Sequence, residues 1–171
     1  MSDPLWVQLL DQADRLADPE GVAPSEADLR RAASAAYYAV FHRLTHLMAT
    51  GVGADLETAA REGLRRVPQH GAMRSVLEWI ERGTAPRAKH AASLLVAEIR
   101  AGAPDAVALG TSFKELQERR HAADYDHLTD FEPIDVADDI DRADLAIDVI
   151  DGLPDPARHA LAVLILAYGG S

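Results

Sequence analysis

The sequence predicts an all-α protein, a helical bundle formed by a single domain over residues 1–171. Three observations lead to this fold class. Apolar residues recur at spacings of three and four along most of the chain, as they do on the buried face of an α-helix. No segment alternates apolar and polar residues in the way that marks a half-buried strand. Helix-starting and helix-stopping residues separate the periodic segments. We expect four to five core helices and some shorter extra helices.

Two helices are expected in the first fifty residues. The proline of "PLWVQLLDQADRLA" suits a first helical turn, and the apolar residues of this segment share one face until the turn signal "DPEGVAP". Ser25 and Asp28 then resemble a capping box, which begins a long helix. We expect this helix to run to about Ala49, with Gly51 and Gly53 ending it. Its spacing predicts that Tyr37 and Phe41 face the core.

The rest of the chain continues the helical pattern. Shorter helices are expected over 54–66, 71–82 and 88–101, longer ones over 105–125 and 134–151, and a last apolar one in "LPDPARHALAVLILAYGG". The three long segments should pack on one another and form the bundle.

Composition narrows the function classes. The chain has no cysteine, which excludes disulfides, thiolate zinc sites and thiol nucleophiles and fits a reducing cytoplasm. The N-terminus lacks a signal-peptide pattern, and the longest apolar run, 160–168, is too short to span a bilayer. We therefore expect a cytoplasmic protein with no membrane contact.

The formal net charge of -11 is unevenly distributed. Residues 124–155 hold twelve acidic side chains and one basic one, whereas residues 61–100 hold eight basic and four acidic. The acidic block most simply solvates an outer helix face. Alternatively, it repels RNA from the wrong side or docks a basic partner such as an antitoxin. The basic stretch leaves a local cationic surface possible.

The segment "RRHAADYDH", residues 119–127, concentrates groups that can act on a phosphodiester. On a continuous helix, Arg120, Asp124 and His127 would share a face. An imidazole can give or take a proton near neutral pH, and a guanidinium can hold a phosphate. These are the groups needed to cleave RNA without a metal, since the 2′-hydroxyl supplies the nucleophile.

Two motifs together resemble the HEPN domain (higher eukaryotes and prokaryotes nucleotide-binding). "LQERRHAADYDH" is similar to its signature of an Arg, a polar residue, a short run and a His, which Arg120, His121 and His127 match in order. "SAAYYAVFH" resembles the second-helix pattern of small prokaryotic members. In relatives a proline often follows "DYD", the place that His127 takes here. The resemblance covers roughly residues 25–150 and implies a bundle of the HEPN type.

The resemblance also implies a function. Many HEPN proteins are metal-independent endoribonucleases that act as toxins or in phage defence. They work as homodimers, often with a minimal nucleotidyltransferase as antitoxin. By this resemblance Arg120 would bind the scissile phosphate, His127 would be general acid or base, and His121 would assist. The supporting or RNA-binding residues would be Arg119, Asp124, Tyr125, Tyr38 and His42.

Other interpretations stay open. The chain could be a non-catalytic HEPN module that binds a nucleotide or a partner nucleotidyltransferase. It could also be a helical interaction protein in which Arg120 and Asp124 merely form a surface ion pair. His42 and His46 have the spacing of two metal ligands on one helix, but no HExxH pattern accompanies them. We therefore expect no metal and no other cofactor. The resemblance implies RNA rather than DNA as the substrate. Neither the RNA target nor a modification at Tyr125 follows from the sequence.

Overall fold

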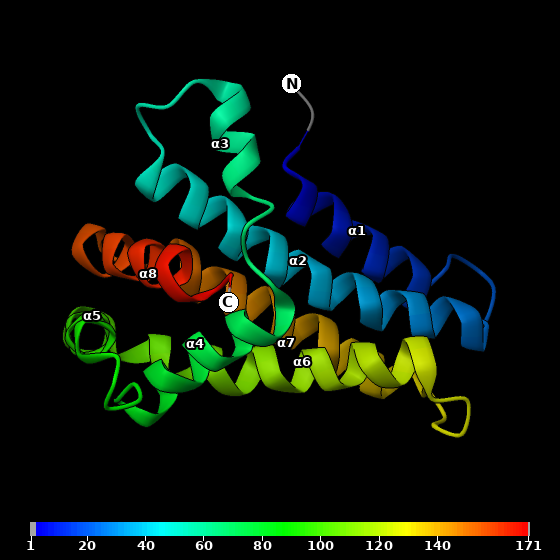
Figure 1. Ribbon diagram of the computed structural model, residues 1–171. Coiled ribbons are helices and arrows are strands. Elements are labelled where there is room, and N and C mark those ends of the chain that lie inside the picture. Colours follow the sequence, from blue (N-terminus) through cyan, green and yellow to red (C-terminus); the bar gives the residue numbers. More distant parts are fainter. Residues whose placement is uncertain (1–2, 171) are drawn as a thin grey trace. The chain divides into compact units, whose positions relative to one another are not determined.

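The computed structural model describes residues 3–170, and all regular structure in that range is helical. The elements are α1 (Leu5–Ala17), α2 (Glu26–Val52), α3 (Thr58–Leu64), α4 (His70–Arg82), α5 (His90–Gly102), the 3-10 helix η1 (Pro104–Val107), α6 (Ala108–Tyr125), α7 (Pro133–Asp151) and α8 (Asp155–Tyr168) (Figure 1). The predicted all-α helical bundle is confirmed. Among these helices none has both the length and the apolar character needed to cross a membrane.

Some predicted boundaries are wrong, for local reasons. The helix predicted over 105–125 begins with η1, because Pro104 stands at its first position. Gly51, predicted to end α2, lies inside the helix. A Cβ atom at this position would come within 2.8 Å of the Cβ atom of Ala162 in α8. Gly51 therefore serves close helix packing, and α2 ends just before Gly53.

The chain divides into two compact units. One contains the residues up to 42 together with 112–147, and the other contains 43–111 together with the residues from 148 onward. Helices α2, α6 and α7 each contribute a part to both units. The expectation of a single domain over the whole chain stays a prediction.

Aromatic side chains form the centre of the first unit. Tyr37 and Phe113 are fully buried, and their ring centroids lie 5.3 Å apart. Phe41 stacks beside Tyr37 with a centroid distance of 6.3 Å. The predicted core positions Tyr37 and Phe41 are thus confirmed. Figure 1 shows α1 running beside the first half of α2, where Ala13 is buried.

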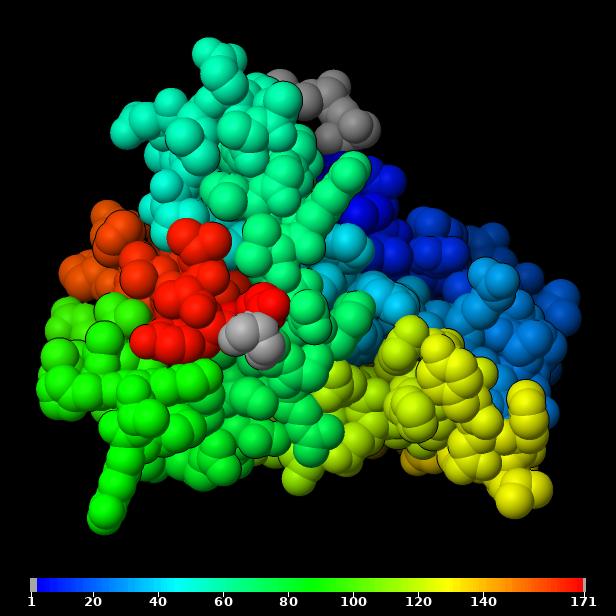
Figure 2. Space-filling view, viewed as in Figure 1, coloured from blue at the N-terminus to red at the C-terminus, as the bar shows by residue number. Residues whose placement is uncertain are grey.

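In the second unit, α8 packs on α4 and α5. The backbone N–H of Gln69 donates to the carbonyl of Gly169 over 2.6 Å, which ties the end of α8 to the start of α4. In Figure 2 the C-terminal part of the chain, in red, lies against green segments of this unit. The ammonium of Lys89 lies 4.8 Å from the ring centroid of Trp79 and 4.9 Å from that of Tyr168. Such cation–π contacts add to the apolar packing of α8.

Close packing makes Gly110 intolerant of a side chain. A Cβ atom there would lie 2.9 Å from the carbonyl oxygen of Leu77 and 2.8 Å from the Cβ atom of Glu81. We expect Gly110→Ala to lower the free energy of unfolding by about 1–3 kcal/mol, because backbone must move. Gly71→Ala is the control, since Gly71 is helical with open space around it and alanine there should stabilise by up to about 1 kcal/mol. Urea denaturation measures both, and equal effects would contradict the packing argument.

A second prediction concerns His46 in α2. Its Nδ1 atom lies 2.7 Å from a guanidinium nitrogen of Arg65, so the neutral imidazole accepts a hydrogen bond. Burial, and then the charge of Arg65, lower the pKa of His46 from 6.5 to about 4. The unfolded chain therefore takes up a proton at a higher pH than the folded chain does. The stability that this difference contributes is complete above about pH 6.5 and is lost as the pH falls toward 4.

We expect His46→Gln to flatten the decline of the free energy of unfolding between pH 6.5 and 4. Arg65→Met should flatten it in part, because the imidazole then loses a nearby positive charge. Urea denaturation at several pH values measures the slope. An unchanged slope in both variants would contradict this assignment.

Candidate functional site

The segment 119–127 does not form one continuous helix. α6 ends at Tyr125, and the last helical hydrogen bond runs from the N–H of Asp126 to the carbonyl of Ala122 over 3.0 Å. The carboxylate of Asp126 then accepts hydrogen bonds from the Leu128 N–H (2.9 Å) and the Thr129 hydroxyl (2.6 Å). These bonds lower the pKa of Asp126, the Thr129 hydroxyl most strongly. They build a tight turn that competes with further helix.

His127 lies in this turn, so the prediction that it shares a helix face with Arg120 and Asp124 is wrong. Its side chain is exposed, and among residues 3–170 it takes part in no hydrogen bond, ion pair or ring contact. The structure therefore presents the imidazole to solvent beside the end of α6.

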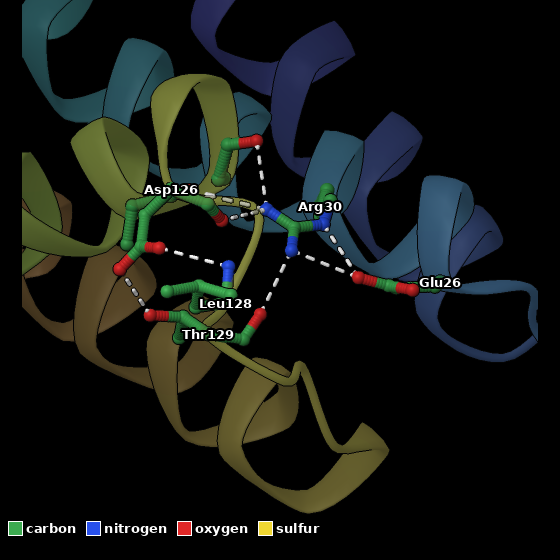
Figure 3. A network of polar contacts seen from close by, with 7 residues as sticks. Glu26, Arg30, Asp126, Leu128 and Thr129 are labelled. Atoms are coloured by element: carbon green, nitrogen blue, oxygen red, sulfur yellow. Dashed lines mark hydrogen bonds and ion pairs between the residues drawn. The ribbon is translucent and has the colours of Figure 1, made fainter.

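Arg30 of α2 holds this turn in place (Figure 3). Its guanidinium donates hydrogen bonds of 2.8–3.2 Å to four carbonyl oxygens, which belong to Ala122, Ala123, Asp126 and Thr129. The first three bonds come from one nitrogen, Nη1. A cation at this place satisfies the carbonyl of Ala123, which the helix leaves without a backbone partner, and offsets the negative end of the helix dipole.

The guanidinium of Arg30 is itself fixed on two further sides. Its Nε atom donates to the carboxylate of Glu26 over 2.9 Å, and its carbon lies 4.9 Å from the ring centroid of Phe131. The side chain is only 16% exposed. Arg30 is thus a structural cation whose guanidinium is committed to Glu26 and to the turn.

Arg120, one turn before the end of α6, belongs to a polar cluster with residues of α2. Its Nη2 atom donates to the Tyr38 hydroxyl over 2.9 Å, and its Nε atom lies 2.7 Å from the carboxylate of Asp124. The other oxygen of that carboxylate accepts a hydrogen bond from the Ser34 hydroxyl over 3.0 Å. The rings of Tyr38 and Tyr125 lie 5.4 Å and 5.7 Å from the guanidinium carbon.

The electrostatics keep Arg120 charged. Burial acts to lower its pKa, but the interactions with Tyr38 and Asp124 outweigh this effect and raise the pKa above its ordinary value. Arg120 therefore keeps its positive charge, and its guanidinium is held in place by Tyr38 of α2 and Asp124 of α6. Arg120, Asp124 and Tyr38 are predicted site residues that the fold does bring together.

The remaining predicted residues lie around this cluster. His121 is exposed, with its ring 5.0 Å from that of Tyr125, which is itself 63% exposed. His42 is half-buried in α2, with its ring 6.3 Å from that of Tyr38 and 5.8 Å from that of Phe41. Thus His42 continues the row of rings along α2.

Arg119 faces another neighbour. Its Nε atom donates to the carboxylate of Asp139 in α7 over 2.8 Å, and its guanidinium carbon lies 4.4 Å from the ring centroid of Phe131. Asp139 is buried, and burial raises its pKa although Arg119 and Arg142 oppose the shift. This arrangement gives Arg119 a structural role between α6 and α7.

A hollow of about 540 Å³ adjoins the Arg120 cluster. It is lined by residues of α1, α2 and α6, namely Leu9, Gln12, Arg30, Arg31, Ser34, Ala35, Tyr38, Ala123 and Asp124. Its volume falls within the range of small-molecule sites, about 300–1,000 Å³. Arg31 is exposed and supplies a positive charge there. In the part of the chain that the structure describes, no three His, Asp or Glu side chains gather closely enough to hold a metal ion.

Sequence reasoning missed Arg30, Arg31 and Ser34 as residues of this region. All three lie in the segment "LRRAASAAYYAVFH", residues 29–42, in which Ser34 stands one turn before Tyr38. That spacing places both side chains on one face of α2. It could have marked Ser34 as a companion of Tyr38, whereas nothing local marks Arg30 as a cap for a helix ninety residues away.

We expect Arg30→Met to destabilise the protein by about 3 kcal/mol, because four part-buried hydrogen bonds lose their charged donor. Methionine keeps much of the apolar stem. Hydrogen exchange of the amides at 126–129 should accelerate more than exchange elsewhere, since the turn loses its anchor. Arg31→Met, a change to the exposed neighbour, is the control and should alter neither measurement. Equal effects of the two substitutions would contradict the capping role.

Comparison with known proteins adds no family assignment. No family model, no curated protein and no solved structure matches the chain. The resemblance to HEPN domains therefore stays a prediction from two motifs, and the chemistry of the cluster must follow from its own geometry and charge.

Proposed function

We propose that the protein is a metal-independent endoribonuclease of the HEPN type that acts as a homodimer. The observation that carries the proposal is the fixed cation of Arg120, held by Tyr38 and Asp124 near a turn that presents the exposed imidazole of His127. A guanidinium in fixed orientation suits a phosphate, and an imidazole suits proton transfer at neutral pH.

In the proposed reaction a base removes the proton of the 2′-hydroxyl, and the resulting oxygen attacks the adjacent phosphorus. The 5′-oxygen leaves with a proton from an acid, so the products are a 2′,3′-cyclic phosphate and a 5′-hydroxyl. Arg120 stabilises the additional negative charge on the phosphorane. His127 serves as acid or base, with His121 assisting. DNA lacks the attacking hydroxyl and is not a substrate.

A second copy completes the proposed site. One acid and one base are needed, and a two-fold axis beside α6 would supply them from His127 of each protomer. Exposed apolar surface supports an interface at this place, since Leu128 is 93% exposed and Tyr125 is 63% exposed. By the same resemblance we propose a cytoplasmic toxin of a toxin–antitoxin or phage-defence pair, with a minimal nucleotidyltransferase as antitoxin.

A second candidate is a non-catalytic module that binds a nucleotide. The hollow of about 540 Å³ favours it, because Arg31 can meet a phosphate while the half-exposed ring of Tyr38 offers a stacking surface. In this case Arg120 would hold phosphate and no bond would break.

The test is incubation of the purified protein with RNA in the presence of a chelator. We expect cleavage, and we expect Arg120→Ala and His127→Ala each to reduce its rate about 100-fold or more. Tyr38→Phe should give a smaller loss, because Arg120 keeps its charge and loses one orienting bond. Lys114→Ala, a change at an exposed cation of the same helix, is the matched control.

Several outcomes discriminate between the candidates. Circular dichroism must show equal helix content in all variants. A 2′-deoxy substitution at the cleaved position should abolish cleavage there. Intact RNA together with saturable nucleotide binding, weakened by Tyr38→Phe and Arg31→Ala, would select the second candidate. If the RNA stays intact and the substitutions change only the association constant of the dimer, the cluster is a dimer contact and has no catalytic or nucleotide-binding role.

A further inference from the structure

A different hollow of the first unit lies between α1 and α7. Its volume is about 520 Å³. The residues that line it are Asp14, Ala17, Asp18, Pro24, Pro133, Ile134, Ala137, Ile140 and Asp141. Its lining is apolar apart from three exposed aspartates, Asp14, Asp18 and Asp141, which we call its rim. We call this hollow the α1/α7 groove.

The apolar part of the α1/α7 groove is open to solvent. Ile134 is 69% exposed and Ala137 is exposed, while Ile140 is buried and forms the floor. Covering an exposed branched apolar side chain such as that of Ile134 is favourable, by about 25 cal/mol for each Å² of apolar surface removed from water. These residues therefore provide a concave surface that fits an apolar side chain.

The rim of the groove carries uncompensated negative charge. Asp14, Asp18 and Asp141 line it, and among the lining residues there is no Arg or Lys. Burial raises the pKa of Asp14, and repulsion from the carboxylates of Asp11, Asp144 and Asp141 raises it further. A cation brought to this rim would relieve that repulsion.

We propose that the α1/α7 groove docks a cationic amphipathic helix of a partner protein. Apolar side chains at three- and four-residue spacing would enter between Ile134 and Ala17, and flanking Lys or Arg side chains would pair with the rim carboxylates. The combination selects this occupant, because an apolar groove alone would accept any hydrophobic segment and the carboxylates reject an acidic one.

Charge also argues against other occupants. RNA phosphates would meet only carboxylates at this rim. The same face of a second copy would bring like charges together across a two-fold axis. The proposal is independent of ribonuclease activity, because the lining of this groove and that of the hollow beside Arg120 have no residue in common.

The test uses a fluorescent synthetic peptide of about 18 residues, roughly five helical turns, with Leu on one face and Lys on the other. Binding is measured by fluorescence anisotropy with the full-length protein. We expect saturable binding that weakens as salt increases. Ala137→Arg should lower the affinity about tenfold or more, because it places a like charge and a larger side chain in the groove. Leu145→Arg is the matched control, since it adds the same charge at an exposed position of α7 outside the groove and should change the affinity about twofold at most.

Two altered peptides separate groove binding from general attraction to an acidic protein. A peptide with Leu replaced by Ser keeps the charge and should lose binding, and so should one with Lys replaced by Glu. Equal binding of the Ser peptide, or equal losses in the two Arg variants, would overturn the proposal. So would failure of the Leu/Lys peptide to bind. If the protein is a dimer that Ala137→Arg dissociates and Leu145→Arg does not, the groove binds a second copy of the chain and the proposal is wrong. The Ala137→Arg variant should cleave RNA at the same rate as the unaltered protein. The docking proposal and the ribonuclease proposal can therefore fail independently of each other.

Discussion

The end of α6 depends on the guanidinium of Arg30. Without a cation at this point, the carbonyl of Ala123 would lie at the part-buried helix end without a partner, and that of Ala122 would keep only its bond from the N–H of Asp126. The same guanidinium reaches Thr129, so it joins the last helical turn to the turn that follows. This constraint determines what the region can do. It ends the helix one residue after Asp124, leaves the Arg120 cluster on rigid backbone, and moves His127 onto a surface turn.

Similar capping recurs elsewhere in the molecule. Arg100 donates to the carbonyls of Ile80 and Glu81 at the end of α4, over 2.7 Å and 2.8 Å. Arg158 donates to the carbonyl of Leu153, just after α7, over 2.7 Å. Each cation meets the negative end of a helix, where a charge is stabilising. One consequence is that a count of basic residues overstates the cationic surface of this chain. The guanidinium groups of Arg30, Arg100 and Arg119 are committed to contacts within the fold, whereas Arg31 is an exposed cation of the hollow and Arg120 stands beside it.

How far the sequence predicts the structure depends on how local each interaction is. The helices and the core positions Tyr37 and Phe41 follow from periodic burial, which a single segment displays by itself. The Arg120–Asp124 pair also follows, because four residues span one helical turn. The position of His127 does not, because a side chain of another helix and the hydrogen bonds of Asp126 decide where α6 stops. The role of Arg119 was missed for the same reason: its partner Asp139 stands twenty residues away on α7, and only the packing of the two helices shows that this carboxylate is buried.

The aspartates of α7 have different surroundings on two sides of the helix. Toward α6, Asp139 receives hydrogen bonds from Arg119 and Arg142, and Arg142 also pairs with Glu115 at 2.8 Å. The buried carboxylate of Asp139 is thus paired within the molecule, and such pairs position helices more than they stabilise them. Toward α1, the carboxylates stand around exposed apolar side chains without a cation among the lining residues. An acidic face that only solvated the helix would need no apolar concavity between its charges. On the side toward α6, an aspartate of α7 therefore has a structural role, whereas on the side toward α1 the aspartates are suited to recognition of a partner.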